Sequence, residues 1–241
     1  MPTRYLSASA RRKPTRKTRS GTTMLSKLLK RINGKIALSF SYQAEDIVVL
    51  DLALKTRDKR IEVFTLDTLK HFDECLAYHK SVESFYQIGV KRYRPNPRAA
   101  SELAKRLGEF GVRESLENRR ECCSVRKVAP LGRALRGKAA WITGLRAAQS
   151  QTRSALNEIE YDEKYDLIKI NPIARWSDRE VFEYIERNNL PINPLYNRGF
   201  KSIGCAPCTR AVKDGEDIRA GRWWWENPEH KECGLHIRNT A

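Results

Sequence analysis

Five of the six cysteines fall into three groups whose spacing indicates metal or thiol chemistry. Cys122 and Cys123 are adjacent in "ECCSVRK", and Cys205 and Cys208 form a Cys-x-x-Cys motif in "GCAPC". Cys233 stands near the C-terminus in "ECGLH". Because two adjacent thiols are poorly placed to bond each other, the first two groups indicate a shared metal site.

The spacing of the two pairs helps to choose the metal. Zinc needs four ligands that converge on one ion at about 2.3 Å, and two adjacent residues converge poorly on one point. A 4Fe-4S cluster has four irons that each take one thiolate, so its ligands must be spread apart. Neighbouring residues on a helix point about 100° apart. The pattern therefore favours an iron–sulfur cluster over zinc, and an intracellular chain disfavours a structural disulfide.

Basic residues accompany both kinds of cysteine. Arg126 and Lys127 follow the adjacent pair by about one helical turn, so at least one can face the thiolates. A cation there would stabilise an anionic cluster and attract an anionic substrate. Cys233 has no cysteine neighbour and is followed by His236. A lone cysteine near a histidine and a basic surface can ionise readily and act as a nucleophile.

Hydrophobic periodicity predicts the elements that must position these residues. Apolar runs predict strands at 35–40, 61–67, 91–96, 139–145 and 166–173. Helical patterns cover 44–56, 72–87, the stretch through the paired cysteines, and 177–189. We expect Cys75, on the second helix, to be a small core residue. Strands alternating with helices predict an α/β fold with an open, mostly parallel sheet and helices on both faces.

Ligands of such sheets bind beyond the carboxyl ends of the strands, and two polar segments fall there. In "SFSYQAED", Ser39, Ser41 and backbone amides at a helix N-terminus can hold a phosphate or sulfate. In "TGLRAAQSQTR", Gly144 lets the backbone approach a ligand, while Arg146 and Arg153 bring positive charge.

Charge and hydropathy divide the chain into three parts. Eleven of the 46 Lys and Arg residues and none of the 29 acids lie in residues 1–35, so most of the +17 charge belongs to this segment. We expect 1–30 to be a basic, disordered tail, 31–190 to be the α/β nucleotide-binding domain, and 191–241 to be an irregular Cys- and Trp-rich segment of the same domain. The tail also resembles an organelle transit peptide.

Composition also excludes some classes of protein. No apolar run approaches the roughly 18 to 20 residues that span a membrane, and the N-terminus lacks the apolar core of a secretory signal. Apart from its tail the chain is only mildly basic, so we expect no nucleic acid partner. These features predict a cytoplasmic protein without a membrane partner.

Taken together, the motifs resemble a known family. "SFSYQAED", "LDT", "ECCSVRKVAPL", "TGLRAAQSQTR", "GCAPCTR", "GEDIRAGRWWWE" and "ECGLH" occur in the order seen in assimilatory adenylyl-sulfate (APS) reductases of the iron–sulfur type. These enzymes are relatives of the phosphoadenylyl-sulfate (PAPS) reductases. The resemblance covers roughly residues 30 to 240. This chain differs in having one more residue in the first loop, and Leu69 where a glycine is usual.

The resemblance implies a fold and a reaction. The fold would be the adenine nucleotide alpha hydrolase-like sheet, and the protein would be an APS reductase of sulfate assimilation and cysteine biosynthesis. Cys233 would attack the sulfur of adenosine 5'-phosphosulfate, release AMP and form an S-sulfocysteine. Thioredoxin, as a separate protein, would then release sulfite. A homo-oligomer is compatible with this family.

Site residues carry over by motif. The resemblance assigns the 4Fe-4S ligands to Cys122, Cys123, Cys205 and Cys208. It assigns substrate binding to Ser39, Phe40, Ser41, Arg126, Lys127, Gly144, Arg153, Arg219, Arg222, Trp223 and His236. Trp224 and Trp225 are expected to be core residues. The cluster is expected to act through electrostatics and structure, not by electron transfer.

Three alternatives stay open at this point. A PAPS reductase has the same nucleophile, but most members lack the four cluster cysteines. A tRNA-thiolating ATPase of the same superfamily should carry an "SGGxDS"-type loop, which "SFSYQAED" is not. A zinc-containing nucleic-acid-binding protein would use the basic tail.

Overall fold

A six-stranded sheet forms the centre of the molecule. A computed structural model describes residues 16–149, 153, 155–227 and 235. The strands are β1 (Lys35–Ser39), β2 (Ile61–Leu66), β3 (Lys91–Tyr93), β4 (Lys138–Ile142), β5 (Ile159–Asp162) and β6 (Leu167–Ile170). They lie in the order β3-β2-β1-β4-β6-β5, and every neighbouring pair is parallel except β5 and β6.

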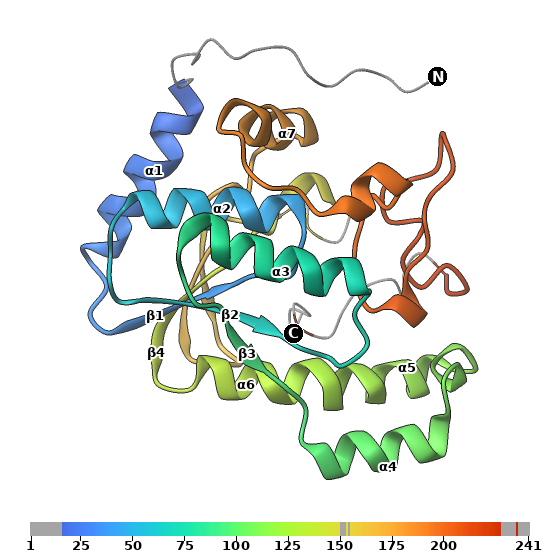
Figure 1. The fold of residues 1–241 in the computed structure, drawn as a ribbon. Coiled ribbons are helices and arrows are strands. Elements are labelled where there is room, and N and C mark those ends of the chain that lie inside the picture. Colours follow the sequence, from blue (N-terminus) through green and yellow to red (C-terminus); the bar gives the residue numbers. More distant parts are fainter. Residues whose placement is uncertain (1–15, 150–152, 154, 228–234, 236–241) are drawn as a thin grey trace.

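Helices cover both faces of this sheet (Figure 1). They are α1 (Arg16–Leu29), α2 (Ala44–Lys55), α3 (Asp73–Tyr86), α4 (Pro97–Leu107), α5 (Leu116–Cys123), α6 (Ala129–Leu135) and α7 (Asp178–Arg187). Successive strand residues point to opposite faces. Ile36 and Leu38 therefore join the core under α2 and α3, whereas Ala37 packs with Trp141 and Leu131 on the α6 side. The predicted α/β class is confirmed.

One strand escaped the sequence analysis. β5 is a short edge strand, "IEYD", in which two of the four residues are acidic. Its apolar side chains, Ile159 and Tyr161, are exposed. Such a strand has no apolar run that periodicity can detect, and its antiparallel pairing with β6 closes one edge of the sheet.

The expectation of a disordered tail through residue 30 is wrong for residues 16–29, which form α1. Leu25 and Leu29, one helical turn apart, are buried in the main core. The guanidinium of Arg60 donates to the carbonyl oxygens of Leu29 (2.7 Å) and Ile32 at the end of the helix. Basic neighbours hide this apolar spacing. Residues 1–15 lie outside the described part of the chain.

The irregular C-terminal segment packs on the main core. Its residues Leu195, Phe200 and Ile203 belong to the same core as α2 and α3. None of the described helices is long and apolar enough to cross a membrane.

The sheet order brings two distant loops together. β1 pairs with β2 on one side and with β4 on the other. The chain therefore leaves β1 in one direction and crosses to its opposite side later. Such a reversal opens a crevice at the carboxyl ends of the strands, between the loops that follow β1 and β4.

Candidate active site

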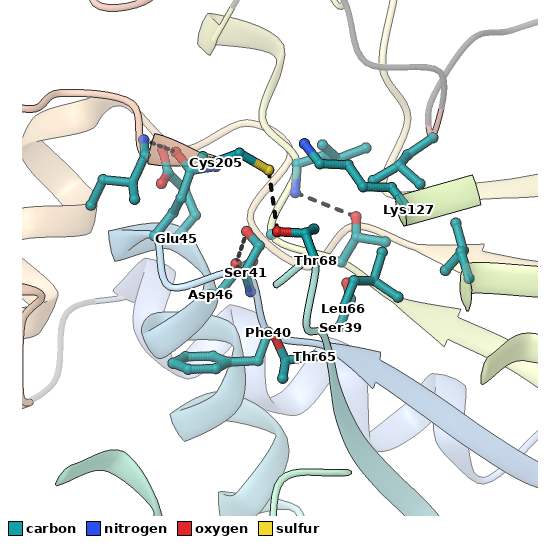
Figure 2. Close-up of a pocket in the computed structure, with 18 of the residues that line it drawn as sticks. Ser39, Phe40, Ser41, Glu45, Asp46, Thr65, Leu66, Thr68, Lys127 and Cys205 are labelled. Carbon is teal, nitrogen blue, oxygen red and sulfur yellow. Dashed lines mark hydrogen bonds between the residues drawn. The ribbon is translucent and has the colours of Figure 1, made fainter. Parts of the chain in front are cut away.

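A pocket occupies this crevice (Figure 2). All predicted substrate-binding residues in the described part of the chain line it except Arg126: Ser39, Phe40, Ser41, Lys127, Gly144, Arg153, Arg219, Arg222 and Trp223. The predicted nucleophile Cys233 and its neighbour His236 lie outside the described residues. Leu235, two positions after Cys233, is described and lines the pocket.

The loop after β1 does not present Ser41 as an open anion site. The backbone amide and the hydroxyl of Ser41 both donate to Oδ2 of Asp46, at 2.6 and 2.5 Å. Asp46 lies in the first turn of α2, so the two donors of Ser41 are directed at this carboxylate in the structure. Burial raises the pKa of Asp46 to about 7, although the bonds from Ser41 oppose this shift. The hydroxyl of Ser39 donates to Ile142 O at 3.4 Å.

The loop after β4 contains one residue that differs from expectation. Arg146 does not line the pocket, because it is buried behind it. Its guanidinium forms an ion pair with Glu45 (2.6 Å) and another with Asp178, and it donates to Trp176 O (3.0 Å). The predicted cation at this position therefore neutralises acids of α2 and α7. Arg153 does line the pocket.

The four predicted cluster ligands line one second cavity. The Cys-x-x-Cys loop there is fixed by bonds from Ala206 N to Lys70 O (2.7 Å) and from Arg113 to Pro207 O (2.9 Å). Burial raises the pKa of Cys208 to about 11 and also raises the pKa of Cys122. Among the described residues, no three His, Cys, Asp or Glu side chains converge closely enough to hold one metal ion. Four thiols on the wall of one cavity are the donor type that an iron–sulfur cluster requires.

A π-helical segment, Ser124–Val128, joins α5 to α6 directly after the paired cysteines. Ala129 N–H donates to Ser124 O, five residues back. Pro130 cannot donate a hydrogen bond to the carbonyl four residues before it, which explains why the regular α-helical ladder breaks here. Such segments are frequent at functional sites. This one carries Arg126 and Lys127.

The pocket and the cysteine cavity share a wall. Lys127, Cys205 and Trp223 line both of them. Thr68 Oγ1 lies 3.3 Å from Cys205 Sγ, and Figure 2 shows this contact at the edge of the pocket. The two cavities are therefore adjacent, and single side chains separate them.

Arg126 lies on the cysteine side of this wall. It lines the cysteine cavity but not the pocket, and its Nη1 donates to Thr68 O at 2.9 Å. The role of Arg126 in substrate binding therefore stays a prediction, and in this structure the side chain lines the cysteine cavity. Its side chain instead ties the π-helical segment to the loop after β2.

Trp223 is buried between two guanidinium groups. Arg119 and Arg222 lie 4.7 and 4.5 Å from its ring, which are cation–π distances. Arg222 Nη1 also donates to Ile203 O at 2.9 Å. By contrast, Trp224 and Trp225, expected in the core, are only half-buried and contact each other and Arg113.

Several pocket residues were not singled out from the sequence. They are either uncharged or bonded to other side chains of the protein. Thr68 was visible only within the "LDT" motif. His71 also lines the pocket, where burial lowers its pKa and its Nε2–H donates to Leu66 O at 3.0 Å. Glu45 and Asp46 were visible only as the acids that begin α2. Periodicity gives no signal for such roles.

Gly144 yields a prediction about packing. A Cβ at this position would overlap Asp46 Oδ1 and lie 3.2 Å from Asp46 N. Gly144→Ala should therefore lower the free energy of unfolding in urea by about 1–3 kcal/mol. The matched control is Gly132→Ala in α6, which has open space around it and should gain up to about 1 kcal/mol. Equal effects of the two changes would contradict the close packing of Gly144 on α2.

Comparisons with known proteins agree with this geometry. Residues 35–211 match the phosphoadenosine phosphosulfate reductase domain. The chain is 47% identical to the adenosine 5'-phosphosulfate reductase of Allochromatium vinosum over 228 residues, which cover 95% of this chain and 88% of the relative. It is 48% identical to the protein of the same name from Neisseria meningitidis serogroup B, over 81% of this chain and 80% of the relative.

Solved structures give the same result for the fold. The crystal structure of the phosphoadenylyl-sulfate (PAPS) reductase from Candida auris, a phosphate complex, matches with a TM-score of 0.66 and 30% identity, over 80% of this chain and 90% of that one. Candida glabrata FMN adenylyltransferase shares the fold alone, with a TM-score of 0.56 and 17% identity, over 93% of this chain and 75% of that one. The resemblance seen in the motifs is confirmed, and the chain belongs to the phosphoadenosine phosphosulfate reductase family.

Proposed function

We propose that this protein is an adenylyl-sulfate reductase, which converts adenosine 5'-phosphosulfate to sulfite and AMP in sulfate assimilation and cysteine biosynthesis. The observation that carries the proposal is the shared wall between a pocket lined by cations and a cavity lined by four cysteines. The names of the relatives from Allochromatium and Neisseria support the choice of substrate.

The cations of the pocket suit a phosphosulfate. Lys127, Arg153, Arg219 and Arg222 all line it. Arginine binds phosphate and sulfate oxygens through a planar fork of donors, and lysine through a point charge. The contact of Arg222 with Ile203 O and with the Trp223 ring fixes its position, so little side-chain entropy is lost when an anion binds.

The chemistry is a pair of displacements at sulfur. The Cys233 thiolate attacks the sulfate sulfur, the bond from that sulfur to the phosphate oxygen breaks, and AMP leaves with both electrons of the broken bond. The enzyme is left with S-sulfocysteine. Leu235, which lines the pocket, supports the assignment because it is two residues from Cys233.

A dithiol protein completes the cycle. One thiolate of thioredoxin attacks Cys233 Sγ and releases sulfite, and the second thiol resolves the mixed disulfide. The dithiol supplies two electrons and becomes a disulfide. Because this step needs reduced thiols, the proposal places the protein in the cytoplasm.

We further propose that Cys122, Cys123, Cys205 and Cys208 hold a 4Fe-4S cluster. Their common cavity and the pairing of adjacent cysteines with a Cys-x-x-Cys motif support this proposal. When bound, the cluster would supply a fixed charge distribution and a structural link, without transferring electrons. Lys127 lies between the thiols and the pocket and would contact both anionic groups.

Mass spectrometry tests the covalent step. Wild-type protein incubated with adenosine 5'-phosphosulfate in the absence of thioredoxin should gain about 80 Da, as expected for one SO3 on Cys233. Cys233→Ser should gain nothing and release no sulfite. Cys75→Ala is the matched control and should still form the adduct, because Cys75 is on the buried face of α3. Sulfite release by Cys233→Ser at the wild-type rate would refute the mechanism.

One observation supports a second substrate, 3'-phosphoadenylyl-sulfate: the Candida auris structure, 30% identical, is named a PAPS reductase. The higher identity to the Allochromatium protein, 47%, favours the nucleotide without the 3'-phosphate. We expect kcat/KM to be higher for the nucleotide without the 3'-phosphate. A clear preference for the phosphorylated nucleotide in the same assay would assign the protein to the second activity.

A further inference from the structure

Two adjacent carboxylates lie on the wall of a pocket that, under the proposed function, binds an anion. Glu45 and Asp46 both line it (Figure 2). An ionised carboxylate repels an anionic ligand strongly where water is excluded. The two acids have different partners, and in the described part of the chain only Glu45 forms an ion pair.

Glu45 is neutralised by a fixed cation. Its Oε1 accepts from Nε (3.1 Å) and Nη2 (2.6 Å) of Arg146, whose guanidinium is buried. The pair is further held by the bond from Arg146 to Trp176 O. The charge of Glu45 is therefore matched before any ligand binds.

Asp46 has hydrogen bonds from Ser41 and from the backbone of Gln43 and, in the described part of the chain, no ion pair. Both bonds from Ser41 go to Oδ2. Oδ1 faces the backbone of Gly144, so closely that a Cβ added at Gly144 would overlap this oxygen. An ionised Asp46 thus leaves a negative charge with no ion-pair partner among the described residues at the loop where an anion would sit, and a protonated Asp46 does not.

The other titratable groups around Asp46 do not change charge near neutral pH. Tyr78 of α3 and Tyr196, from the segment Pro194–Arg198, have pKa values raised by burial, so they stay neutral. Burial lowers the pKa of His71, so it is neutral above about pH 6.5. The cations Lys127, Arg153, Arg219 and Arg222 line the same pocket as Asp46.

We propose that Asp46 takes up one proton from solvent when the anionic substrate binds, so that substrate affinity depends on pH through this side chain. The proton would reside on Oδ1 while Oδ2 keeps the bonds from Ser41. The physical reason is that two like charges in one buried site cannot both stay ionised. This inference rests on the proposed function.

The sign of the effect follows from the raised pKa of Asp46, about 7. Below that pH the free protein already carries the proton, so affinity is independent of pH. Above it each binding event must take up a proton, and affinity falls by up to tenfold per pH unit. Adenosine 5'-phosphosulfate has no group that titrates between about pH 6.5 and 8.5, so any proton taken up belongs to the protein.

Calorimetry on the Cys233→Ser protein, which cannot form the adduct, measures this directly. Titration with adenosine 5'-phosphosulfate in two buffers of different ionisation enthalpy should show uptake of close to one proton at about pH 8.5 and little at about pH 6.5. The dissociation constant should rise at least about tenfold over this range. Adding Asp46→Asn should abolish the proton uptake and reduce the pH dependence to within about twofold.

A matched control is Asp58→Asn, at the amino end of β2, which should keep the full pH dependence. If Asp46→Asn does not fold, Ser41→Ala replaces it. Loss of the hydroxyl donor should raise the pKa of Asp46 and move the onset of the pH dependence upward. Binding that takes up no proton and does not vary with pH would overturn the inference and leave the proposed function intact. Failure to bind at any pH would refute the proposed function, and the inference with it.

Discussion

The rest of the site depends on one constraint, the thin wall between the pocket and the cysteine cavity. Lys127, Cys205 and Trp223 form it, and each lines both sides. Because Lys127 belongs to a π-helical segment next to the paired cysteines, its position is fixed by the same turn that places two of the thiols. A charged group bound by the cysteines would therefore act electrostatically on the pocket.

Charge compensation is the second theme of this structure. A pocket lined by four cations also carries the carboxylates of Glu45 and Asp46. Arg146 neutralises Glu45, whereas Asp46 accepts hydrogen bonds from Ser41 and the backbone of Gln43, and burial raises its pKa. On the far side of the wall, the same Lys127 lowers the pKa of Cys122 and Cys208 against the effect of burial. Lys127 thus acts electrostatically on both the pocket and the thiols.

The sequence motifs predicted the function of this chain more completely than periodicity predicted its helices and strands. The strands and helices with clear apolar periodicity were found, and the loops after β1 and β4 were placed correctly at one edge of the sheet. α1 was missed because basic residues surround Leu25 and Leu29, and β5 because it is short and half acidic. Sequence gives the charge of Arg126 and Arg146 but not which way they point, so it did not predict that neither lines the pocket. Ser41 donates both of its hydrogen bonds to Asp46, and nothing in the sequence signals this pairing.

We predict that the cysteine cavity holds iron and sulfur and that its absorption responds to a ligand in the pocket. The most direct test is to purify the protein without oxygen, determine its metals, and record its visible absorption during a titration with adenosine 5'-phosphosulfate. We predict a brown protein with roughly four irons per chain, whose absorption spectrum changes as the nucleotide binds. A colourless protein that contains zinc and no iron, or an iron spectrum that does not respond to bound nucleotide, would contradict this prediction.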